Sequence, residues 1–219
     1  MLSPAVEDYL KVIYKLQSGS DAAAVSTGDV ARAMSVSAPS ATSMIKRLDE
    51  LGFLTYTSYR GAALTASGKK VALEVIRHHR LLELYLREVL DYTWGEVHDE
   101  AEHLEHHISE MFESKIEEML GYPTRDPFGH PIPARDGTLD AVSTRSLAQM
   151  DAGEAACIDY IADEDADLLQ LLEDRGLLPG AIAEVREVRP LDGILTVAVS
   201  GTEQIIGEAV AIKVFVRSL

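Results

Sequence analysis

Histidine is confined to one stretch of this sequence, and the same stretch is strongly acidic. All 7 histidines lie between His78 and His130. Residues 73–143 carry 16 Asp and Glu against 6 Lys and Arg. Imidazole nitrogens and carboxylate oxygens are ligands that divalent first-row transition metals accept in proteins. The stretch therefore predicts a metal site of mixed nitrogen and oxygen ligands.

Four residues of this stretch have the spacing of a single helical face. They occupy positions i, i+4, i+7 and i+8 and are His98, Glu102, Glu105 and His106. At about 100° per residue they fall within roughly 100° of arc, so all four side chains should point to one side of a helix. On the preceding predicted helix, His79 and Glu83 repeat the i, i+4 pairing and can face the first group in an antiparallel arrangement.

A less specific interpretation is a solvated acidic helix carrying scattered histidines. It explains the acidic residues but not two His/Glu pairs on neighbouring helices. A further cluster of Glu100, His103 and His107 lies on the opposite face of the same predicted helix and has no matching partner elsewhere in the sequence. We interpret these three as solvated surface residues.

The elements that must position these ligands are two long helices. One is predicted from Thr65 or Ser67 to Leu90, and the second from about Trp94 to Leu120. Prolines and glycines between residues 123 and 137 then predict an irregular linker.

The first third of the chain predicts a winged helix-turn-helix. Residues 6–16 have a helical apolar stripe, Thr27 is a predicted N-cap for a short helix over 28–34, and Ser37 caps a third helix over 38–51. Gly52 ends that helix, and residues 53–65 read as strand, turn, strand. Such a module places its small-residue third helix in the major groove of DNA.

The charge distribution supports this assignment. The whole chain has a net charge of −16, but residues 1–72 are +2, whereas residues 73–143 are −10 and residues 144–219 are −8. The only net-positive third is therefore the one expected to face the phosphates. The candidate DNA-binding residues are Thr27, Ser37, Pro39, Ser40, Ser43, Lys46, Arg47 and Arg60.

The last third predicts a small β-barrel. Residues 181–188, 194–200 and 208–216 are β-branched or alternate in polarity, and turn sequences separate them. A helix from Glu164 to Leu172 precedes them.

Several motifs together resemble the diphtheria toxin repressor family of metalloregulators, which includes iron-dependent regulators and manganese transport regulators. The motifs are residues 97–106 (VHDEAEHLEH), 78–83 (HHRLLE), 7–10 (EDYL) and 127–133 (PFGHPIP). The resemblance spans the whole chain, because the long members of the family also end in an SH3-like barrel. It implies a mainly α fold with β structure: a winged helix-turn-helix domain (1–72), a helical dimerisation and metal-binding domain (73–143) and an SH3-like, FeoA-like domain (144–219).

The resemblance also implies two metal sites. The first would use Asp8, Glu102, Glu105 and His106, and the second would use His79, Glu83 and His98, completed by Glu164 and Asp167 of the barrel domain. Arg80 matches a family residue near an anion site, and Asp126 stands where the family usually has a small hydroxyl residue. The short manganese regulators carry a glutamate at the position of Lys11, so we expect two separate mononuclear sites here.

The implied function is a metal-activated transcriptional repressor that binds double-stranded operator DNA as a homodimer and controls metal-homeostasis and uptake genes. Mn²⁺ is the expected metal because both Asp8 and Glu102 are carboxylates where iron-type members have sulfur ligands. Fe²⁺ is the alternative, and Co²⁺, Ni²⁺, Zn²⁺ or Cd²⁺ are expected to substitute in vitro. No organic cofactor is expected.

An enzyme is the rival class, either a metal-dependent hydrolase or a di-metal oxidase. A zincin needs His-Glu-x-x-His, which the sequence lacks, and a di-iron bundle needs two Glu-x-x-His motifs, of which Glu100–His103 is one. A metal buffer is a third class, but it would not need a winged helix. We therefore expect a non-enzymatic protein.

The expected location is the cytoplasm. The first residues lack the basic start and apolar run of a signal peptide, and no stretch is apolar for long enough to span a bilayer. The single cysteine, Cys157, excludes an intrachain disulfide. No membrane partner is expected.

Overall fold

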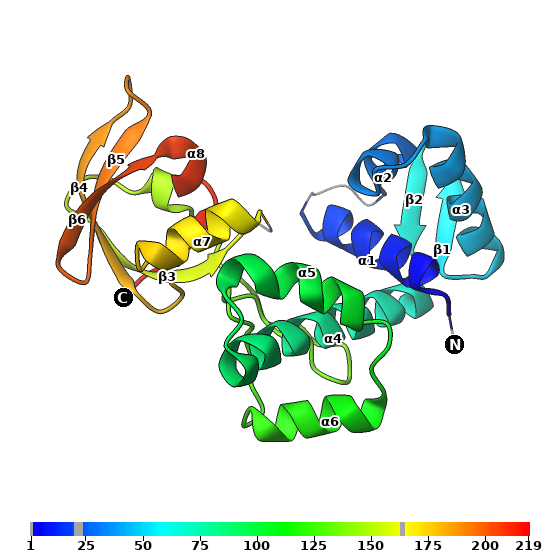
Figure 1. The fold of residues 1–219 in the computed structure, drawn as a ribbon. Helices are drawn as coiled ribbons and strands as arrows, with labels where there is room; N and C mark the ends of the chain where they lie inside the picture. Colours follow the sequence, from blue (N-terminus) through cyan, green and yellow to red (C-terminus); the bar gives the residue numbers. More distant parts are fainter. Residues whose placement is uncertain (1, 20–23, 163–164) are drawn as a thin grey trace. The chain divides into compact units, whose positions relative to one another are not determined.

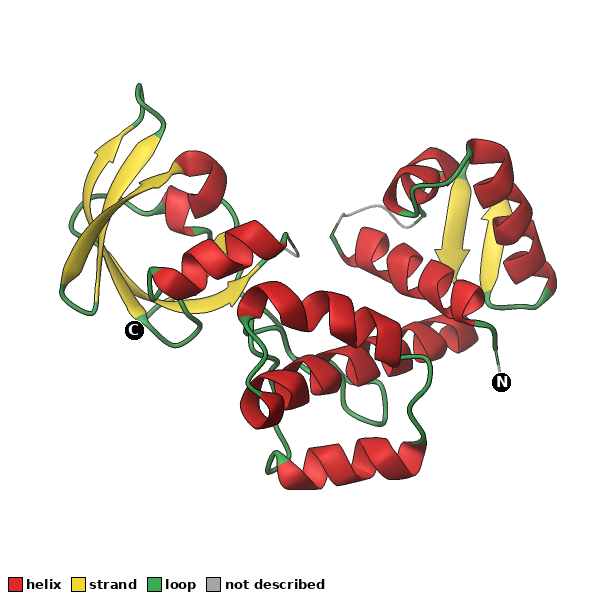
Figure 2. Ribbon diagram, viewed as in Figure 1, coloured by secondary structure: helices red, strands yellow, loops and turns green. Residues whose placement is uncertain are grey.

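The computed structural model describes residues 2–19, 24–162 and 165–219. These form two compact units, one of Met1–His78 with Pro133–Thr138 and one of His79–Ile132 with Leu139–Leu219. Figures 1 and 2 show helices and a two-stranded sheet in the first unit, and helices with a larger sheet in the second. Within the described ranges, no helix has the length and hydropathy needed to cross a membrane.

The first unit contains the predicted winged helix-turn-helix. Its elements are α1 (Pro4–Ser18), α2 (Thr27–Ala33), α3 (Ala38–Glu50), β1 (Leu54–Thr57) and β2 (Gly61–Leu64). The apolar stripe of α1 is buried as predicted, and it packs with the inner faces of α2 and α3 and with the hairpin in one core. Strands β1 and β2 pair antiparallel, from Leu54 with Leu64 to Thr57 with Gly61.

Local capping determines where these helices begin. Ser37 caps α3 as predicted, because its side chain accepts a hydrogen bond from the amide of Ser40. The prediction for α2 was wrong by one residue. Ser26, rather than Thr27, is the N-cap, and its hydroxyl accepts from the amide of Asp29 at 3.0 Å. Thr27 is instead the first helical residue.

Helix α4 (Ala66–Leu90) is a single element of 25 residues that continues from the first unit into the second. Its first turn lies against the loop before the hairpin. A Cβ on Gly68 would lie 1.9 Å from the carbonyl oxygen of Phe53, so only glycine permits this approach.

The second predicted helix of the central region is in fact two. Helix α5 (Trp94–Leu104) ends before a turn, and α6 (Glu110–Met119) follows it. Ser109 caps α6 by accepting from the amide of Phe112, so a new helix starts where the sequence pattern predicted continuity.

The C-terminal region is a five-stranded antiparallel sheet of the FeoA/SH3-like type, in the order β6-β5-β4-β3-β7. The elements are η1 (Leu147–Gln149), β3 (Ala155–Ile161), α7 (Ala166–Asp174), β4 (Ile182–Arg189), β5 (Ile194–Val199), β6 (Thr202–Gly207), α8 (Glu208–Ala211) and β7 (Val214–Arg217). Strands β4 and β5 lie where predicted, whereas the predicted strand over 208–216 is instead α8 followed by β7. Strands β3 and β6 were not predicted, and β6 begins where the sequence suggested only a turn.

Within the second unit, the helices and the sheet share a hydrophobic core. Leu82 of α4 and Val97 of α5 belong to the same buried cluster as Leu169 of α7 and Val185 of β4. Helix α7 lies close to α5, since the amide of Trp94 donates to Glu173 at 3.2 Å. The site-bearing helices are therefore supported by the C-terminal region.

Candidate metal centre and nucleic-acid interface

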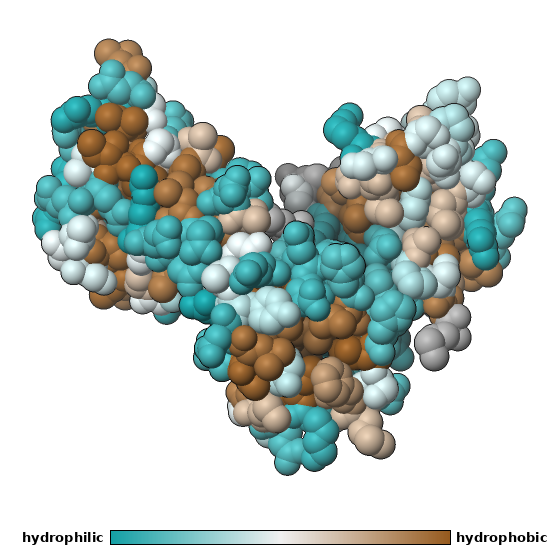
Figure 3. All heavy atoms as spheres, in the orientation of Figure 1, coloured by the Kyte–Doolittle hydropathy of each residue, from teal (hydrophilic) through white to brown (hydrophobic). Residues whose placement is uncertain are grey.

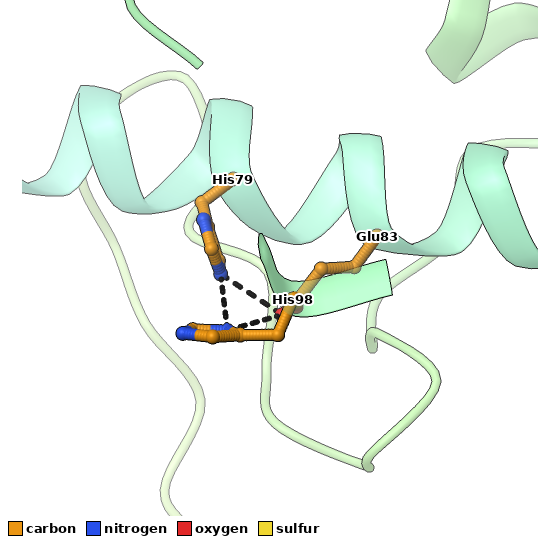
Figure 4. Close-up of side chains that lie close together, drawn as sticks. All are labelled: His79, Glu83 and His98. Carbon is orange, nitrogen blue, oxygen red and sulfur yellow. Dashed lines mark hydrogen bonds and ion pairs between the residues drawn. The ribbon is translucent and has the colours of Figure 1, made fainter. Parts of the chain in front are cut away.

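Helices α4 and α5 bring three predicted metal ligands together. His79 and Glu83 lie one turn apart on α4, and His98 lies in the first half of α5. The start of α5 is held by a capping box, in which the carboxylate of Glu96 accepts from the amide of Thr93 at 2.9 Å. Figure 4 shows the three ligand side chains converging from the two helices.

The three side chains lie within direct contact distance. Nε2 of His79 is 2.9 Å from Oε1 of Glu83 and 3.2 Å from Nδ1 of His98. Nδ1 of His98 is 3.2 Å from the same oxygen of Glu83. Two imidazole nitrogens and one carboxylate oxygen therefore face one point, so the structure brings together three of the residues predicted for the second site.

The environment keeps the Glu83 side chain, which is 4% exposed, in its charged form. Burial alone would raise the pKa of its carboxyl group. The charge of His79 and the hydrogen bonds from His79 and His98 outweigh that effect and hold the pKa well below its usual range. A buried carboxylate that stays ionised is a suitable ligand for a divalent cation.

The other nitrogen of His79 faces the residues predicted for the first site. Its Nδ1 is 2.6 Å from Oε2 of Glu105 and 3.9 Å from Oε1 of Glu102. The second oxygen of Glu105, Oε1, lies 3.2 Å from Nε2 of His106. The Glu105 side chain is fully buried, whereas that of Glu102 is 36% exposed.

These donors fit a divalent metal. Possible ligand atoms of His79, Glu83 and His98 all lie within 4.8 Å of one another, as do those of His79, Glu102 and Glu105. They are nitrogen and oxygen atoms on α4, on α5 and on the turn that follows α5, and two of the carboxylates are buried. Such a set would hold an ion that accepts mixed imidazole and carboxylate ligands, as Mn²⁺, Fe²⁺ and Zn²⁺ do.

One part of the geometric prediction was wrong. Glu105 and His106 do not lie on the same helix as His98 and Glu102, because α5 ends at Leu104 and Glu105–His107 form a turn. The amide of His107 bonds back to the carbonyl of Leu104 at 2.9 Å, which closes that turn. The turn, rather than an ideal helical face, sets the direction of His106.

The remaining predicted ligands are distributed as follows. Asp8 is half-buried on α1 of the first unit. Asp167 is exposed in the first turn of α7 and, in the part of the chain that the structure describes, belongs to none of the ligand clusters. Glu164 lies outside the described residues.

The opposite face of α5 agrees with its interpretation as a surface. His103 and His107 are exposed and Glu100 is half-exposed. Nδ1 of His103 lies 2.6 Å from the carbonyl oxygen of Asp99, a contact within its own helix. None of the three joins a ligand cluster among the described residues.

Asp126 supplies a buried carboxylate beside Arg80. Its Oδ1 accepts from the amides of Phe128 and His130, both at 2.9 Å, which fixes the side chain in a tight turn. Its Oδ2 lies 3.6 Å from Nε of Arg80 and 3.2 Å from Nδ1 of His130. Arg80 also donates to the carbonyl of Pro131 at 2.5 Å. The carboxylate of Asp126 therefore supplies the negative charge that faces Arg80.

The candidate DNA-binding residues lie mainly on α3 and the hairpin. Seven of them are exposed: Ser37, Pro39, Ser40, Ser43, Lys46, Arg47 and Arg60. Thr27, at the start of α2, is half-buried. Lys46, Arg47 and Arg60 form no ion pair within the described ranges, so their charges remain available to an anionic partner.

Two features of the site were not predicted. The hydrogen bond from His79 to Glu105 joins residues 26 positions apart, and the pairing of Arg80 with Asp126 joins residues from a helix and an irregular segment. Neither follows from a periodic pattern, because both depend on how separate segments pack.

Three family models match the chain. The model described as "Iron dependent repressor, N-terminal DNA binding domain" matches residues 1–62. The model described as "Iron dependent repressor, metal binding and dimerisation domain" matches residues 65–134, and the FeoA domain matches residues 145–218. Together they extend over nearly the whole sequence.

Individual relatives are similar along their full lengths. The iron-dependent repressor IdeR of Mycobacterium tuberculosis is 32% identical over 217 residues, which covers 93% of this chain and 92% of that protein. A manganese-dependent transcriptional repressor solved in complex with manganese is 36% identical, with a TM-score of 0.88, and covers 98% of this chain and 100% of that one. The repressor ScaR with bound Zn²⁺ is 30% identical, with a TM-score of 0.79, covering 98% and 99%.

Proposed function

Because the chain belongs to the diphtheria toxin repressor family of iron-dependent repressors, we propose that it binds operator DNA as a homodimer when Mn²⁺ occupies its central domain, and so represses metal-uptake genes. The chain is a metal-dependent transcriptional regulator and not an enzyme, since its relatives are transcriptional repressors. Its expected location is the cytoplasm, where it meets operator DNA.

The observation that carries the proposal is the cluster of His79, Glu83 and His98. These residues form a compact set of nitrogen and oxygen donors, and two of them lie on α4, the helix that continues directly from the winged-helix domain. A bound cation there can influence the helix that leads to the DNA-binding elements.

Two sites are proposed. The first is assigned to Asp8, Glu102, Glu105 and His106, and the second to His79, Glu83 and His98, completed by Asp167 and Glu164. We expect each site to hold one ion, because Lys11 is a cation where a bridging carboxylate would be needed to hold two close metals.

The physical logic is linkage between metal binding and DNA binding. When bound, the metal supplies positive charge to a set of carboxylates that repel one another. Asp8 belongs to α1 of the DNA-binding domain, whereas Glu102 and Glu105 belong to the central domain. Ligands contributed by both domains would restrict the DNA-binding domains of a dimer to the spacing of two half-sites. Metal binding would then raise DNA affinity without contacting DNA.

Mn²⁺ is proposed as the activating metal because the first site has only oxygen ligands besides His106. Hard oxygen donors favour Mn²⁺ in relative terms, and selectivity against Zn²⁺ would come from coordination number, since Zn²⁺ prefers four ligands. A relative solved with manganese supports this choice, whereas the iron-dependent relatives make Fe²⁺ the alternative.

The homodimer is proposed to form through the central domain, the part that matches the family's dimerisation domain. Helix α6 and the turn after it expose four large apolar side chains: Met111 (77%), Phe112 (44%), Met119 (63%) and Tyr122 (67%). Figure 3 shows hydrophobic side chains gathered over the region of α4 and α6. Large apolar side chains exposed together on one helix and the turn after it are typical of a protein–protein contact.

The test is a DNA-binding titration of the full chain on its own promoter fragment, with Mn²⁺, Fe²⁺, Co²⁺ and Zn²⁺ added separately. We expect no specific shift without metal and a specific, salt-sensitive shift with Mn²⁺ at the lowest free metal concentration. Specific binding that is equally tight in the presence of a chelator would contradict the proposal.

A further inference from the structure

The tip of the hairpin between β1 and β2 presents a tyrosine that the rest of the chain does not hold. The tip consists of Ser58, Tyr59 and Arg60, and all three are exposed. The exposure of Tyr59 is 106%, the highest value for a large hydrophobic residue in the described ranges. Among those residues, its side chain takes part in no hydrogen bond, ion pair or ring contact. Packing within the chain therefore does not explain a tyrosine at this position.

The backbone of Tyr59 is also strained. Its φ angle is 65°, in the left-handed region that glycine and asparagine adopt at little cost and that a bulky residue rarely adopts. Residues held in such conformations cluster where a protein contacts a ligand. A tip that only faced solvent would be more stable with glycine or asparagine here. A tyrosine that is both strained and unpacked therefore points to a partner outside the chain.

The hairpin supports this tip firmly. The amide of Arg60 donates to the carbonyl of Thr57 at 2.9 Å, which closes the turn. Val25 and Ala62 exchange two backbone hydrogen bonds, of 2.9 and 2.8 Å. A Cβ on Gly61 would lie 2.3 Å from the carbonyl oxygen of Val25, so the backbones touch directly after the tip. The position of Tyr59 is therefore determined by the winged-helix unit.

The hairpin is also tied to the end of α3. The amide of Phe53 donates to the carbonyl of Leu48 at 3.0 Å, and the amide of Tyr56 donates to Oδ1 of Asp49 at 3.2 Å. The four residues of β1 span about 13 Å, and the tip continues beyond them. Half a turn of B-DNA, which separates a major groove from the next minor groove, is about 17 Å. With α3 in the major groove, Tyr59 therefore comes within reach of the adjacent minor groove.

We propose that Tyr59 reads the minor groove flanking each α3 contact and makes the chain prefer A·T base pairs there. This inference deepens the proposed function and rests on it, since it assumes that α3 docks in the major groove of operator DNA. Arg60, an exposed cation beside Tyr59, is attracted to the negative potential of a narrow, A·T-rich minor groove.

The chemistry of the groove floor supplies the preference. An A·T pair presents only acceptors there, N3 of adenine and O2 of thymine, to which the phenolic hydroxyl of Tyr59 can donate. A G·C pair adds the 2-amino group of guanine, which is a donor and takes up room on the groove floor. The same tyrosine therefore fits an A·T flank and is opposed by a G·C flank.

The experiment measures the affinity of the Mn²⁺-loaded full chain, by fluorescence anisotropy, for duplexes that share the footprinted promoter core. They differ only in the flanking pairs about 5 base pairs from the centre of each α3 contact, which are A·T, inosine·C or G·C. Inosine lacks the 2-amino group, so inosine·C keeps the minor-groove acceptors of A·T while its major groove resembles G·C.

We expect equal affinity for the A·T and inosine·C flanks, and at least about fivefold weaker binding with the G·C flank, the lower end of the usual effect of one wrong base pair. A loss that the inosine·C flank shared would place the contact in the major groove and overturn the proposal.

The matched variants are Tyr59→Gly and Ser58→Gly. Tyr59→Gly removes the ring and suits the left-handed backbone, so we expect the flank preference to disappear while the urea midpoint of unfolding is unchanged or higher. Ser58→Gly alters a neighbouring exposed residue of the tip and should keep the preference. A preference that survived in Tyr59→Gly, or a lower urea midpoint in that variant, would refute the role of Tyr59 as a DNA contact.

Failure of the proposed function would look different from failure of this inference alone. In the first case the unsubstituted chain would show no Mn²⁺-dependent binding to any of the three duplexes, which would overturn both. In the second case it would bind all three duplexes in a Mn²⁺-dependent manner and with equal affinity.

Discussion

Glu83 and Glu105 are carboxylates that water scarcely reaches, with side chains 4% and 0% exposed. Burial of an ionised carboxylate is costly unless positive charge or hydrogen-bond donors compensate it. In this chain the compensation comes from the rings of His79, His98 and His106. We therefore expect a bound cation to stabilise these two buried carboxylates more than any exposed carboxylate of the site.

Metal preference should respond to a single ligand atom. Replacing Glu102 by cysteine introduces a thiolate into the proposed first site, and soft sulfur ligands favour Fe²⁺, Co²⁺ and Zn²⁺ over Mn²⁺. We expect Glu102→Cys to move the activation preference of DNA binding away from Mn²⁺ toward those metals. Operator-binding midpoints for each metal would measure the change.

The control is Glu118→Cys, which adds a thiol at an exposed carboxylate on α6 outside the proposed sites. It should leave the order of metal preference unchanged. If Glu102→Cys also left the order unchanged, the proposed source of selectivity would be wrong.

Phosphate contacts by Arg47 should contribute to affinity without contributing to sequence preference. We expect Arg47→Ala to weaken binding to all DNA sequences and to reduce the slope of log affinity against log salt by about 0.9 for each lost contact. Changes at Ser43, by contrast, should alter the preference among sequences. Fluorescence anisotropy on operator and scrambled duplexes over a range of salt would separate the two effects.

Arg186→Ala is the matched control, since Arg186 is an exposed arginine of the C-terminal sheet paired with Glu184. It should change neither affinity nor salt slope. Intact operator affinity of Arg47→Ala at physiological salt would rule out the docking of α3 proposed here.

At the scale of elements, α4 runs from the winged-helix unit to the proposed metal ligands. Its first turn packs against the loop that leads into the hairpin, and its middle carries His79 and Glu83. The close approach at Gly68 fixes where the helix begins relative to the wing. A substitution at this contact should therefore change the stability of the first unit.

Gly68→Ala should destabilise the protein, although the same change in an ordinary helix is stabilising by up to about 1 kcal/mol. The added Cβ would lie 1.9 Å from the backbone carbonyl oxygen of Phe53. Because this atom belongs to the backbone, it cannot move away without straining the surrounding structure. We expect a loss of roughly 1–3 kcal/mol in the free energy of unfolding, measured by urea denaturation.

The neighbouring substitution Ser67→Ala serves as the control, because Ser67 is exposed in the same turn. It should change the unfolding free energy by less than about 0.5 kcal/mol. A stabilising effect of Gly68→Ala would show that the contact with Phe53 relaxes at little cost.

At the scale of the whole molecule, the core of the second unit includes both the helices that carry the proposed metal ligands and the C-terminal sheet. Arg87 of α4 and the amide of Trp94 both contact Glu173 of α7. The C-terminal region is therefore a structural support for the site and not an independent appendage. The contribution of Asp167 is better tested by substitution than by truncation.

Dimer formation should depend on the exposed apolar side chains of α6. We expect Met111→Glu to weaken self-association at least tenfold, since a charge at a buried contact easily costs the 1.4 kcal/mol that this factor represents. Operator affinity should fall with it, because two half-sites are read by one dimer. Analytical ultracentrifugation would measure the association constant.

Leu191→Glu places the same charge at a fully exposed leucine of the β4–β5 turn. This control should dimerise normally. If Met111→Glu remained dimeric at the same concentrations as the control, another surface would have to form the dimer.

The sequence by itself was enough to predict the family and the fold class. Periodicity and spacing are local properties, so the pairing of His79 with Glu83 and the apolar stripe of α1 could be derived from them and are present in the structure. The capping of α3 by Ser37 was predicted for the same reason, since a cap needs only its own next few residues.

What only the tertiary structure decided lies where segments distant in sequence meet. The end of α5 at Leu104 directs His106 from a turn, and the packing of α4 against α5 brings Nδ1 of His79 within 2.6 Å of Glu105. Strand β3 was missed because its residues are almost continuously buried between β4 and β7, so they lack the alternation that marks a half-exposed strand. Each of these outcomes depends on contacts between segments that are distant in the sequence. A local sequence pattern therefore cannot predict it.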